Sequence, residues 1–119
     1  MTERVLVVDD SPFQRTVFRD ALDGSFDVVG EVENGAEAVE LFEAHEPDAV
    51  SMDVVMPEMT GIEATRAIKD RWPDAAVVMC TSVDQREKMM EAVKAGADGY
   101  VTKPVDPDDL VPELECHLG

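Results

Sequence analysis

Residues able to handle phosphate or a metal ion follow four short apolar runs of this sequence. Asp9 and Asp10 come directly after the first run, and Asp53 follows another run near the middle of the chain. Thr81 and Lys103 stand at the ends of two later runs. If the runs are parallel strands, their carboxyl ends meet at one edge of a sheet, where three carboxylates, a hydroxyl and an ammonium would converge. Such a set of groups is typical of a metal-assisted phosphoryl site.

The three carboxylates need a compensating charge if they lie together. About three negative charges within a few ångströms repel one another, and at least one group would hold its proton. Mg²⁺ removes this conflict, because it binds one or two carboxylates and keeps water or phosphate in its other positions. A local role as an N-cap before Pro12 would account for one of Asp9 and Asp10, but not for both.

Asp53 is then a candidate nucleophile toward phosphorus, with an acyl phosphate as the product. Phosphoryl transfer depends mainly on positioning and on stabilising the charge of the equatorial oxygens. In this interpretation Lys103 and the metal ion supply positive charge, and the hydroxyl of Thr81 supplies a hydrogen bond. An exposed loop lysine is the alternative for Lys103.

The elements that must position these residues alternate along the chain. Strand-like apolar runs are followed by stretches with helical spacing, and each stretch opens with a start signal such as the capping box at residues 11–14. The expected strands are residues 4–8, 26–32, 48–52, 76–80 and 99–102. The expected helix starts are residues 11–14, 34–37, 60–63, 84–87 and 106–109.

Stop signals and apolar stripes complete the helix prediction. Gly24 and Gly96 are expected C-caps, and Pro47 and Pro73 prevent continuation. Each helix carries one apolar stripe, which we expect to face the core. The stripes are Phe13, Val17 and Ala21; Ala38, Val39 and Phe42; Ile62, Ala64, Thr65 and Ile68; Met89, Ala92 and Val93; and Leu110, Val111, Leu114 and Leu118.

Five strands alternating with five helices predict an α/β fold. Several of the strands are continuous β-branched runs, which is typical of a parallel sheet with helices on both faces. The 119 residues are enough for one domain with a proper core and too few for two, so we expect a single domain over residues 1–119.

The charge of the chain restricts its partners. There are 27 acidic residues against 10 basic ones, a formal net charge of -17. Nucleic acids and anionic membranes would repel such a surface, so we expect neither as a partner. The acids are spread over the whole chain, which resembles the surfaces of proteins from salt-accumulating halophiles. At about 1 M salt the Debye length is only ~3 Å, so self-repulsion is screened and removal of salt should destabilise the protein. An unfolding midpoint unchanged between molar and millimolar potassium chloride would contradict this.

The sequence contains no targeting signal that we recognise. No basic segment precedes a long apolar stretch, and no run approaches the length of a membrane span, so we expect a cytoplasmic protein. Cys80 and Cys116 form no CxxC pattern and are expected to be reduced thiols. His45 and His117 are isolated, and we expect them at helix ends on the surface.

Four motifs of the chain occur together in the order of one known family. They are Val7-Val8-Asp9-Asp10-Ser11, Met52-Asp53-Val54-Val55-Met56-Pro57-Glu58-Met59-Thr60-Gly61, Thr81-Ser82 and Ala95-Gly96-Ala97-Asp98-Gly99-Tyr100-Val101-Thr102-Lys103-Pro104. With them the chain resembles the receiver domain family of two-component signalling, from end to end. Within that family it looks most like the stand-alone chemotaxis response regulators, which the tract at residues 27–39 also resembles.

The resemblance implies a flavodoxin-like (βα)5 fold with strand order 2-1-3-4-5, the order of flavodoxin and of chemotaxis regulators. It also implies that Asp53 is the phosphoacceptor and that Mg²⁺ binds Asp10, Asp53 and the backbone carbonyl of Val55. Asp9 would reach the ion through water, and Lys103 would contact the phosphoryl oxygens.

The resemblance further implies how the signal leaves the site. Thr81 and Tyr100 match the switch pair, in which the hydroxyl moves toward the phosphoryl group and the aromatic ring swings inward behind it. The helix at 84–95, the strand at 99–102 and the last helix would form the output face.

The function implied is a signalling switch and not an enzyme, beyond self-phosphorylation from small donors and autodephosphorylation. The expected partners are a histidine kinase of the chemotaxis type, a motor or motor-adaptor protein, and a phosphatase, with the chain itself a monomer. A phosphorelay intermediate is the alternative within the family.

Two other classes of protein share parts of the pattern. A magnesium phosphohydrolase would usually have a second acid two residues after its nucleophile, where this chain has Val55, and a cap over its substrate. A flavodoxin-type electron carrier would cradle phosphate in its first loop, where Asp9 and Asp10 would repel it.

Overall fold

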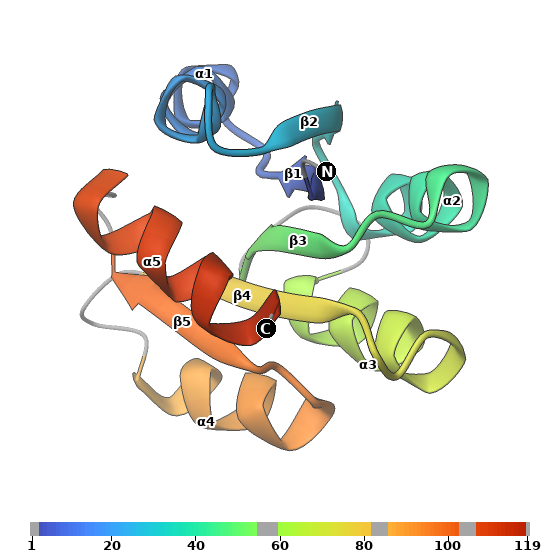
Figure 1. Cartoon of the computed structure of the whole chain (residues 1–119). Coiled ribbons are helices and arrows are strands. Elements are labelled where there is room, and N and C mark those ends of the chain that lie inside the picture. The colour runs from blue at the N-terminus through green and yellow to red at the C-terminus, as the bar shows by residue number, and fades with distance from the viewer. Residues whose placement is uncertain (1–2, 55–59, 82–85, 103–106, 119) are drawn as a thin grey trace.

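The computed structural model describes residues 3–54, 60–81, 86–102 and 107–118. Strands and helices alternate along these residues, as the sequence predicts (Figure 1). The strands are β1 Arg4–Val8, β2 Asp27–Val32, β3 Ala49–Asp53, β4 Ala76–Thr81 and β5 Gly99–Thr102. The helices are α1 Pro12–Leu22, α2 Gly35–His45, α3 Gly61–Arg71, α4 Arg86–Ala95 and α5 Pro107–Leu118.

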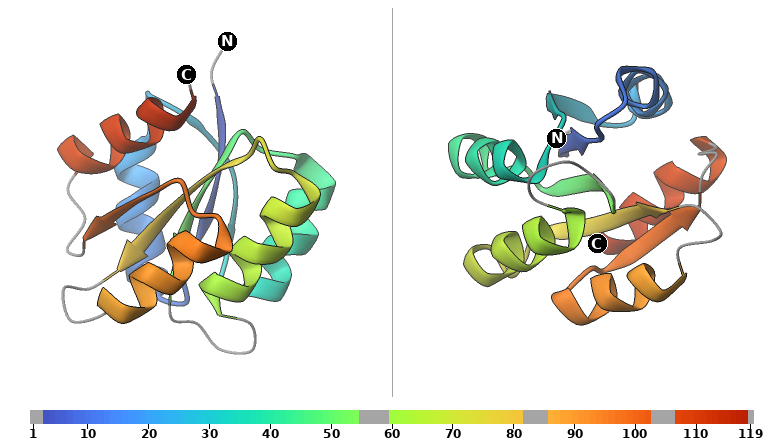
Figure 2. Two further views of the ribbon diagram at one scale, coloured as in Figure 1. Left: turned by 90° about the horizontal axis from the view of Figure 1, so that it is seen from below. Right: turned by 180° about the vertical axis from the view of Figure 1, so that it is seen from behind.

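The five strands form one parallel sheet in the order β2-β1-β3-β4-β5. Helices α1 and α5 cover one face of the sheet, and α2, α3 and α4 cover the other (Figure 2). The predicted flavodoxin-like α/β fold and its strand order are therefore confirmed. In such a sheet all carboxyl ends of the strands lie at one edge, which is where ligands bind.

The sheet is buried on both faces, which explains its continuous apolar strands. Alternate residues of a strand point to opposite faces, so each strand supplies two cores. In β1, Leu6 and Val8 pack under α2, α3 and α4, whereas Val5 and Val7 pack under α1 and α5.

The predicted helix caps are largely present. Thr60 and Glu63 form a complete capping box, and the side chain of Asn34 accepts from the amide of Glu37 at 2.9 Å. Ser11 accepts from the amide of Gln14 at 3.3 Å, but the amide of Ser11 donates to Asp9 Oδ1 at 2.9 Å. In a capping box, the side chain at the third helical position accepts from the amide of the N-cap residue. At α1 the carboxylate of Asp9 accepts from that amide instead.

Two residues assigned to core stripes from their spacing are exposed, so that part of the prediction is wrong. Phe13 is 73% exposed and Val93 is 58% exposed. Helix α1 faces the sheet with Phe18 and Leu22, and at about 100° per residue Phe13 lies about 140° from Phe18. In α4 the buried residues include Ala92 and Ala95, and Val93, which follows Ala92, turns outward.

Strand and helix ends differ from prediction by one or two residues. Asp53 is the last residue of β3 and Thr81 is the last residue of β4, so each belongs to its strand. Gly24 and Gly96 have φ of 86° and 116°, in keeping with their expected role after helices. The expected cap at Asp84 lies outside the described residues. Over the described ranges, no helix is both long and apolar enough to cross a bilayer.

Candidate functional site

The strand register brings the acids together at the carboxyl edge of the sheet. Val8 of β1 lies opposite Met52 of β3, so the next residues, Asp9 and Asp53, are neighbours across the two strands. Asp53 in turn lies opposite Cys80 of β4. Thr81, which ends β4, therefore follows at the same edge, as the sequence predicts.

The carboxylates of Asp9, Asp10 and Asp53 form one cluster. One oxygen from each lies within 4.8 Å of the others. Asp9 is fully buried, Asp53 is 6% exposed and Asp10 is exposed to solvent. The carboxylates of Asp9 and Asp53 are thus inside the protein, and that of Asp10 lies on the solvent side of the cluster.

Contacts from two elements fix Asp9. Its amide donates to the carbonyl of Val32 at 3.0 Å, which ties the end of β1 to the end of β2. Its Oδ1 accepts from the amide of Ser11, and its carbonyl accepts from Arg15 Nη1 at 2.6 Å. The local role weighed for this acid is therefore present, and the same carboxylate also belongs to the cluster.

Glycine at position 61 allows the site to be built. The amide of Val54 donates to the carbonyl of Cys80 at 3.3 Å, and the amide of Gly61 donates to the carbonyl of Val54 at 3.0 Å. A Cβ at residue 61 would overlap the carbonyl oxygen of Asp53. The start of α3 therefore lies against the main chain of the candidate nucleophile. From the sequence, Gly61 was predicted only to be part of a helix start. Its contact with Asp53 was not predicted, although Gly61 belongs to the motif that begins at Asp53.

The donor set fits a hard divalent cation. Mg²⁺ takes oxygen ligands at about 2.0–2.1 Å, so opposite ligands in an octahedron are about 4.2 Å apart. The spacing of the three carboxylate oxygens, within 4.8 Å, is close to that range. The cluster could hold Mg²⁺ with small side-chain movements, and the ion would offset the repulsion of three adjacent acids.

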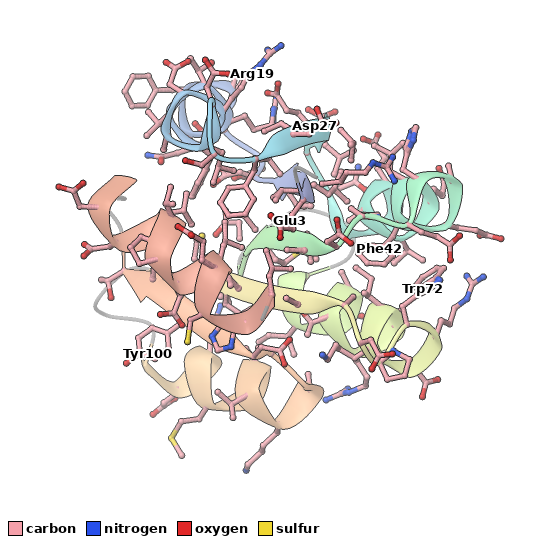
Figure 3. The ribbon with its side chains drawn as sticks, viewed as in Figure 1. Glu3, Arg19, Asp27, Phe42, Trp72 and Tyr100 are labelled. Atoms are coloured by element: carbon pink, nitrogen blue, oxygen red, sulfur yellow. The ribbon has the colours of Figure 1, made fainter. Side chains whose placement is uncertain are left out.

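The other predicted site residues lie at or near this edge, or outside the described chain. Lys103 and Val55 are outside the described residues, so their roles stay predictions. Tyr100 lies in the edge strand β5 opposite Met79 and is 48% exposed. Figure 3 shows the ring of Tyr100 at the outer side of β5. The role of Tyr100 and Thr81 as a switch pair also stays a prediction.

Exposed apolar side chains gather on the face formed by α4 and β5. Met90 and Val93 of α4 are exposed together with Tyr100 of β5. A hollow beside Tyr100 is bordered by Thr102, Asp109 and Glu113, so it continues from β5 onto α5. This is the surface that the sequence analysis expects to carry the output.

Comparison with known proteins defines the class. The response regulator receiver domain family matches residues 5–115, which includes the whole sheet and the acid cluster. The chain belongs to this family. Receiver domains bind Mg²⁺ at an acidic pocket, and the carboxylates of Asp9, Asp10 and Asp53 form such a pocket here.

Individual relatives point to one branch of the family. The chain is 54% identical over 104 residues to the chemotaxis protein CheY of Halobacterium salinarum, with 87% of each chain covered. It is 43% identical to CheY of Bacillus subtilis over 119 residues, with 99% of each covered. The first relative also agrees with the halophile-like composition of this chain.

A solved structure shows the same fold. The crystal structure of the CheX-CheY-BeF3-Mg+2 complex from Borrelia burgdorferi matches with a TM-score of 0.89 and 26% identity. The match covers 96% of this chain and 87% of that one. Together these similarities support a chemotaxis response regulator, a signalling switch and not a classical enzyme.

Proposed function

We propose that this protein is a chemotaxis response regulator that is phosphorylated on Asp53 by a histidine kinase. The observation that carries the proposal is the position of Asp53 at the carboxyl end of central strand β3, with its carboxylate in one cluster with those of Asp9 and Asp10. Similarity to CheY proteins over most of the chain gives the cluster its context.

The proposed reaction uses the buried carboxylate as a nucleophile. An oxygen of Asp53 attacks the phosphorus of a phosphohistidine, the P–N bond breaks, and the imidazole leaves with the kinase. Asp53, Asp10 and the carbonyl of Val55 would hold Mg²⁺, with Asp9 reaching it through water. When bound, the ion offsets the charge of the acids and of the phosphoryl oxygens. Lys103 would neutralise a further phosphoryl oxygen.

The proposed switch uses Thr81 and Tyr100. A phosphoryl group adds up to about two negative charges and three strong acceptors at the ends of β3 and β4. The hydroxyl of Thr81 would move toward it, and the half-exposed ring of Tyr100 would turn inward behind it. Shifting such an equilibrium from 1:99 to 99:1 takes ~5.5 kcal/mol, which two or three charge-assisted hydrogen bonds could largely supply.

The proposed output is a change in the face formed by α4, β5 and α5. Met90, Val93 and Tyr100 give this face apolar contact area that a protein partner could cover. A motor or motor-adaptor protein would bind the phosphorylated form, and a phosphatase would reset it. The complex of CheX and CheY from Borrelia burgdorferi supports a protein partner for the activated state.

The proposal includes the expected organisation of the protein. Residues 1–119 would act as one receiver domain, as a monomer in the cytoplasm, without nucleic acid or membrane insertion. Coverage of 99% of a stand-alone chemotaxis protein supports this, and favours the chemotaxis role over a phosphorelay intermediate.

A small phosphodonor tests the proposal without knowledge of the kinase. The protein is incubated with acetyl phosphate and Mg²⁺ at about 1 M potassium chloride, where its self-repulsion is screened. We expect the intact mass to rise by one phosphoryl group, and the adduct to be lost when Mg²⁺ is omitted. The variant Asp53→Asn should form no adduct, whereas Asp20→Asn, an exposed position on α1, should react like the wild type. An adduct that persists in Asp53→Asn would contradict the proposal.

A further inference from the structure

Basic side chains are scarce in this protein, and most of those described bind an oxygen atom. Against 27 acidic residues the chain has 10 basic ones. Five of them donate to carbonyl or carboxylate oxygens of other residues: Arg4, Arg15, Arg19, Lys69 and Arg71. Arg66, Lys88 and Lys94 form no hydrogen bond or ion pair with any residue in the described part of the chain.

These three cations line the same cavity, between α3 and α4. The two helices lie side by side on one face of the sheet (Figure 2). The cavity has a volume of about 450 Å³. Arg66 borders it from α3, and Lys88 and Lys94 border it from α4. On a molecule with a net charge of -17, a hollow that gathers three cations without a partner among the described residues stands apart from the rest of the surface.

The acids that line the cavity offset only part of these charges. Glu63 and Glu91 also line it. Glu63 Oε1 already accepts from the amide and the hydroxyl of Thr60 at 3.3 and 3.2 Å, because it belongs to the capping box of α3. Among the described residues of the lining, three cations therefore face two carboxylates, one of which also accepts hydrogen bonds at the helix start.

The inner part of the cavity is apolar. Val54 and Ile62 contribute to its lining, and Val54 is 1% exposed. The residues described around the cavity do not include the acid cluster of Asp9, Asp10 and Asp53. The proposed phosphoryl chemistry thus gives these cations no role, and the cavity offers both an apolar surface and positive charge.

The spacing of the cations favours an extended ligand. Lys88 and Lys94 are six residues apart on one helix, which is about 9 Å along its axis. This axial separation suits a ligand that carries two negative groups some distance apart. Two acidic side chains seven residues apart on a helix are about 10.5 Å apart along its axis, which matches the separation.

We propose that the cavity between α3 and α4 is a docking groove for an acidic, amphipathic segment of a partner protein. Carboxylates of the segment pair with Lys88, Lys94 and Arg66, and an apolar side chain between them packs against Ile62. Charge complementarity favours this occupant, since neither of the other hollows described here gathers cations without a partner among the described residues. The inference is independent of phosphorylation at Asp53.

A designed peptide is the probe. A helix-forming peptide with two glutamates seven residues apart, and leucine and isoleucine between them, is titrated into the ¹⁵N-labelled protein up to millimolar concentration at about 0.2 M potassium chloride, where exposed ion pairs are screened less than at about 1 M. We expect amide shift changes confined to α3, α4 and the end of β3. The same peptide with glutamine in place of glutamate should bind at least about fivefold more weakly.

Single-charge variants provide the matched comparison. Lys88→Gln and Lys94→Gln should each raise the Kd about threefold to fivefold, and the double variant about tenfold or more. Arg19→Gln removes the same charge from α1, and its Kd should stay within about twofold of wild type. Thermal unfolding of each variant shows that it is folded, which is expected because these side chains are exposed.

Several results would overturn the proposal. These are no shift at millimolar peptide, shifts centred on other helices, or equal affinity for the glutamine peptide. The proposal would also be overturned if the double variant bound the glutamate peptide with the same Kd as the wild type. If acetate or inorganic phosphate alone reproduces the shifts, the groove binds small anions. If dilution of the protein alone reproduces them, it binds a second copy.

Discussion

The two edges of the sheet use the same residue types in opposite ways. At the amino edge, Asp48 accepts from the amide of Arg4 at 2.8 Å, and Asp98 accepts from the amide of Val77 and from Lys69 Nζ, each at 2.9 Å. At the carboxyl edge, Asp9, Asp10 and Asp53 are brought together within 4.8 Å. Each of these acids at the amino edge joins neighbouring strands, whereas the acids at the carboxyl edge share one cluster. The first arrangement holds the fold together, and the second forms an acidic pocket that could hold a cation.

The amino edge also carries the aromatic contacts. Trp72 lies against Phe42 with ring centroids 4.8 Å apart, and the guanidinium of Arg71 lies over the Trp72 ring at 4.4 Å. Figure 3 shows Phe42 and Trp72 pointing toward each other between α2 and the end of α3. These contacts join α2 to the end of α3 at the amino edge.

The largest effect should come from changing Gly61 to alanine. The added Cβ overlaps the carbonyl oxygen of Asp53, so the start of α3 or the end of β3 must move. We expect a loss of about 3 kcal/mol in the free energy of unfolding, measured by urea titration at about 1 M potassium chloride. Gly24→Ala is the control, because it has a positive φ but open space around it, and should lose about 1 kcal/mol. Equal losses would mean that close packing at Asp53 is unimportant.

The next effect should come from the ion pair of the amino edge. Lys69 Nζ donates to the carbonyls of Pro73 and Ala75 as well as to Asp98, so Lys69→Met removes three contacts of a largely buried ammonium. We expect a loss of about 2 kcal/mol in unfolding free energy, with phosphorylation by acetyl phosphate unchanged. Glu43→Gln weakens the exposed pair with Arg71 and should change stability by less than about 0.5 kcal/mol. A large fall in phosphorylation rate in Lys69→Met would show that the two edges are not separate in function.

The smallest effect should come from magnesium at the carboxyl edge. Added Mg²⁺ binds the folded protein, so at ten times its Kd it should stabilise the wild type by about 1.4 kcal/mol. In Asp10→Asn one carboxylate of the cluster is lost, and the stabilisation at the same concentration should largely disappear. Without the ion that variant should be at least as stable as wild type, because repulsion among the acids is relieved. The measurement is thermal unfolding with and without Mg²⁺, and an equal shift in both proteins would place the ion elsewhere.

The sequence predicted the fold and the convergence of the acids because both follow from local patterns. Parallel strands put their carboxyl ends at one edge, so residues such as Asp9 and Asp53 meet once the strand order is known. That order came from family resemblance and not from periodicity, since periodicity says nothing of which strands are neighbours.

Features that depend on packing between elements could not be predicted. Phe13 has the spacing of a core residue, but the rotation of α1 about its axis is set by Phe18 and Leu22 on the sheet. The contact of Gly61 with Asp53 depends on the approach of α3 to β3. The gathering of Arg66, Lys88 and Lys94 requires α3 and α4 to be side by side, which neither helix specifies alone.

The central claim is that Asp53 accepts the phosphoryl group, and chemical trapping tests it most directly. The protein is treated with acetyl phosphate and Mg²⁺, reduced with borohydride, digested and mapped by mass spectrometry. An acyl phosphate at Asp53 is reduced to homoserine, so the account predicts homoserine at position 53 and unmodified aspartate at positions 9 and 10. Homoserine at another acid, or none at position 53 in protein that carries the adduct, would contradict it.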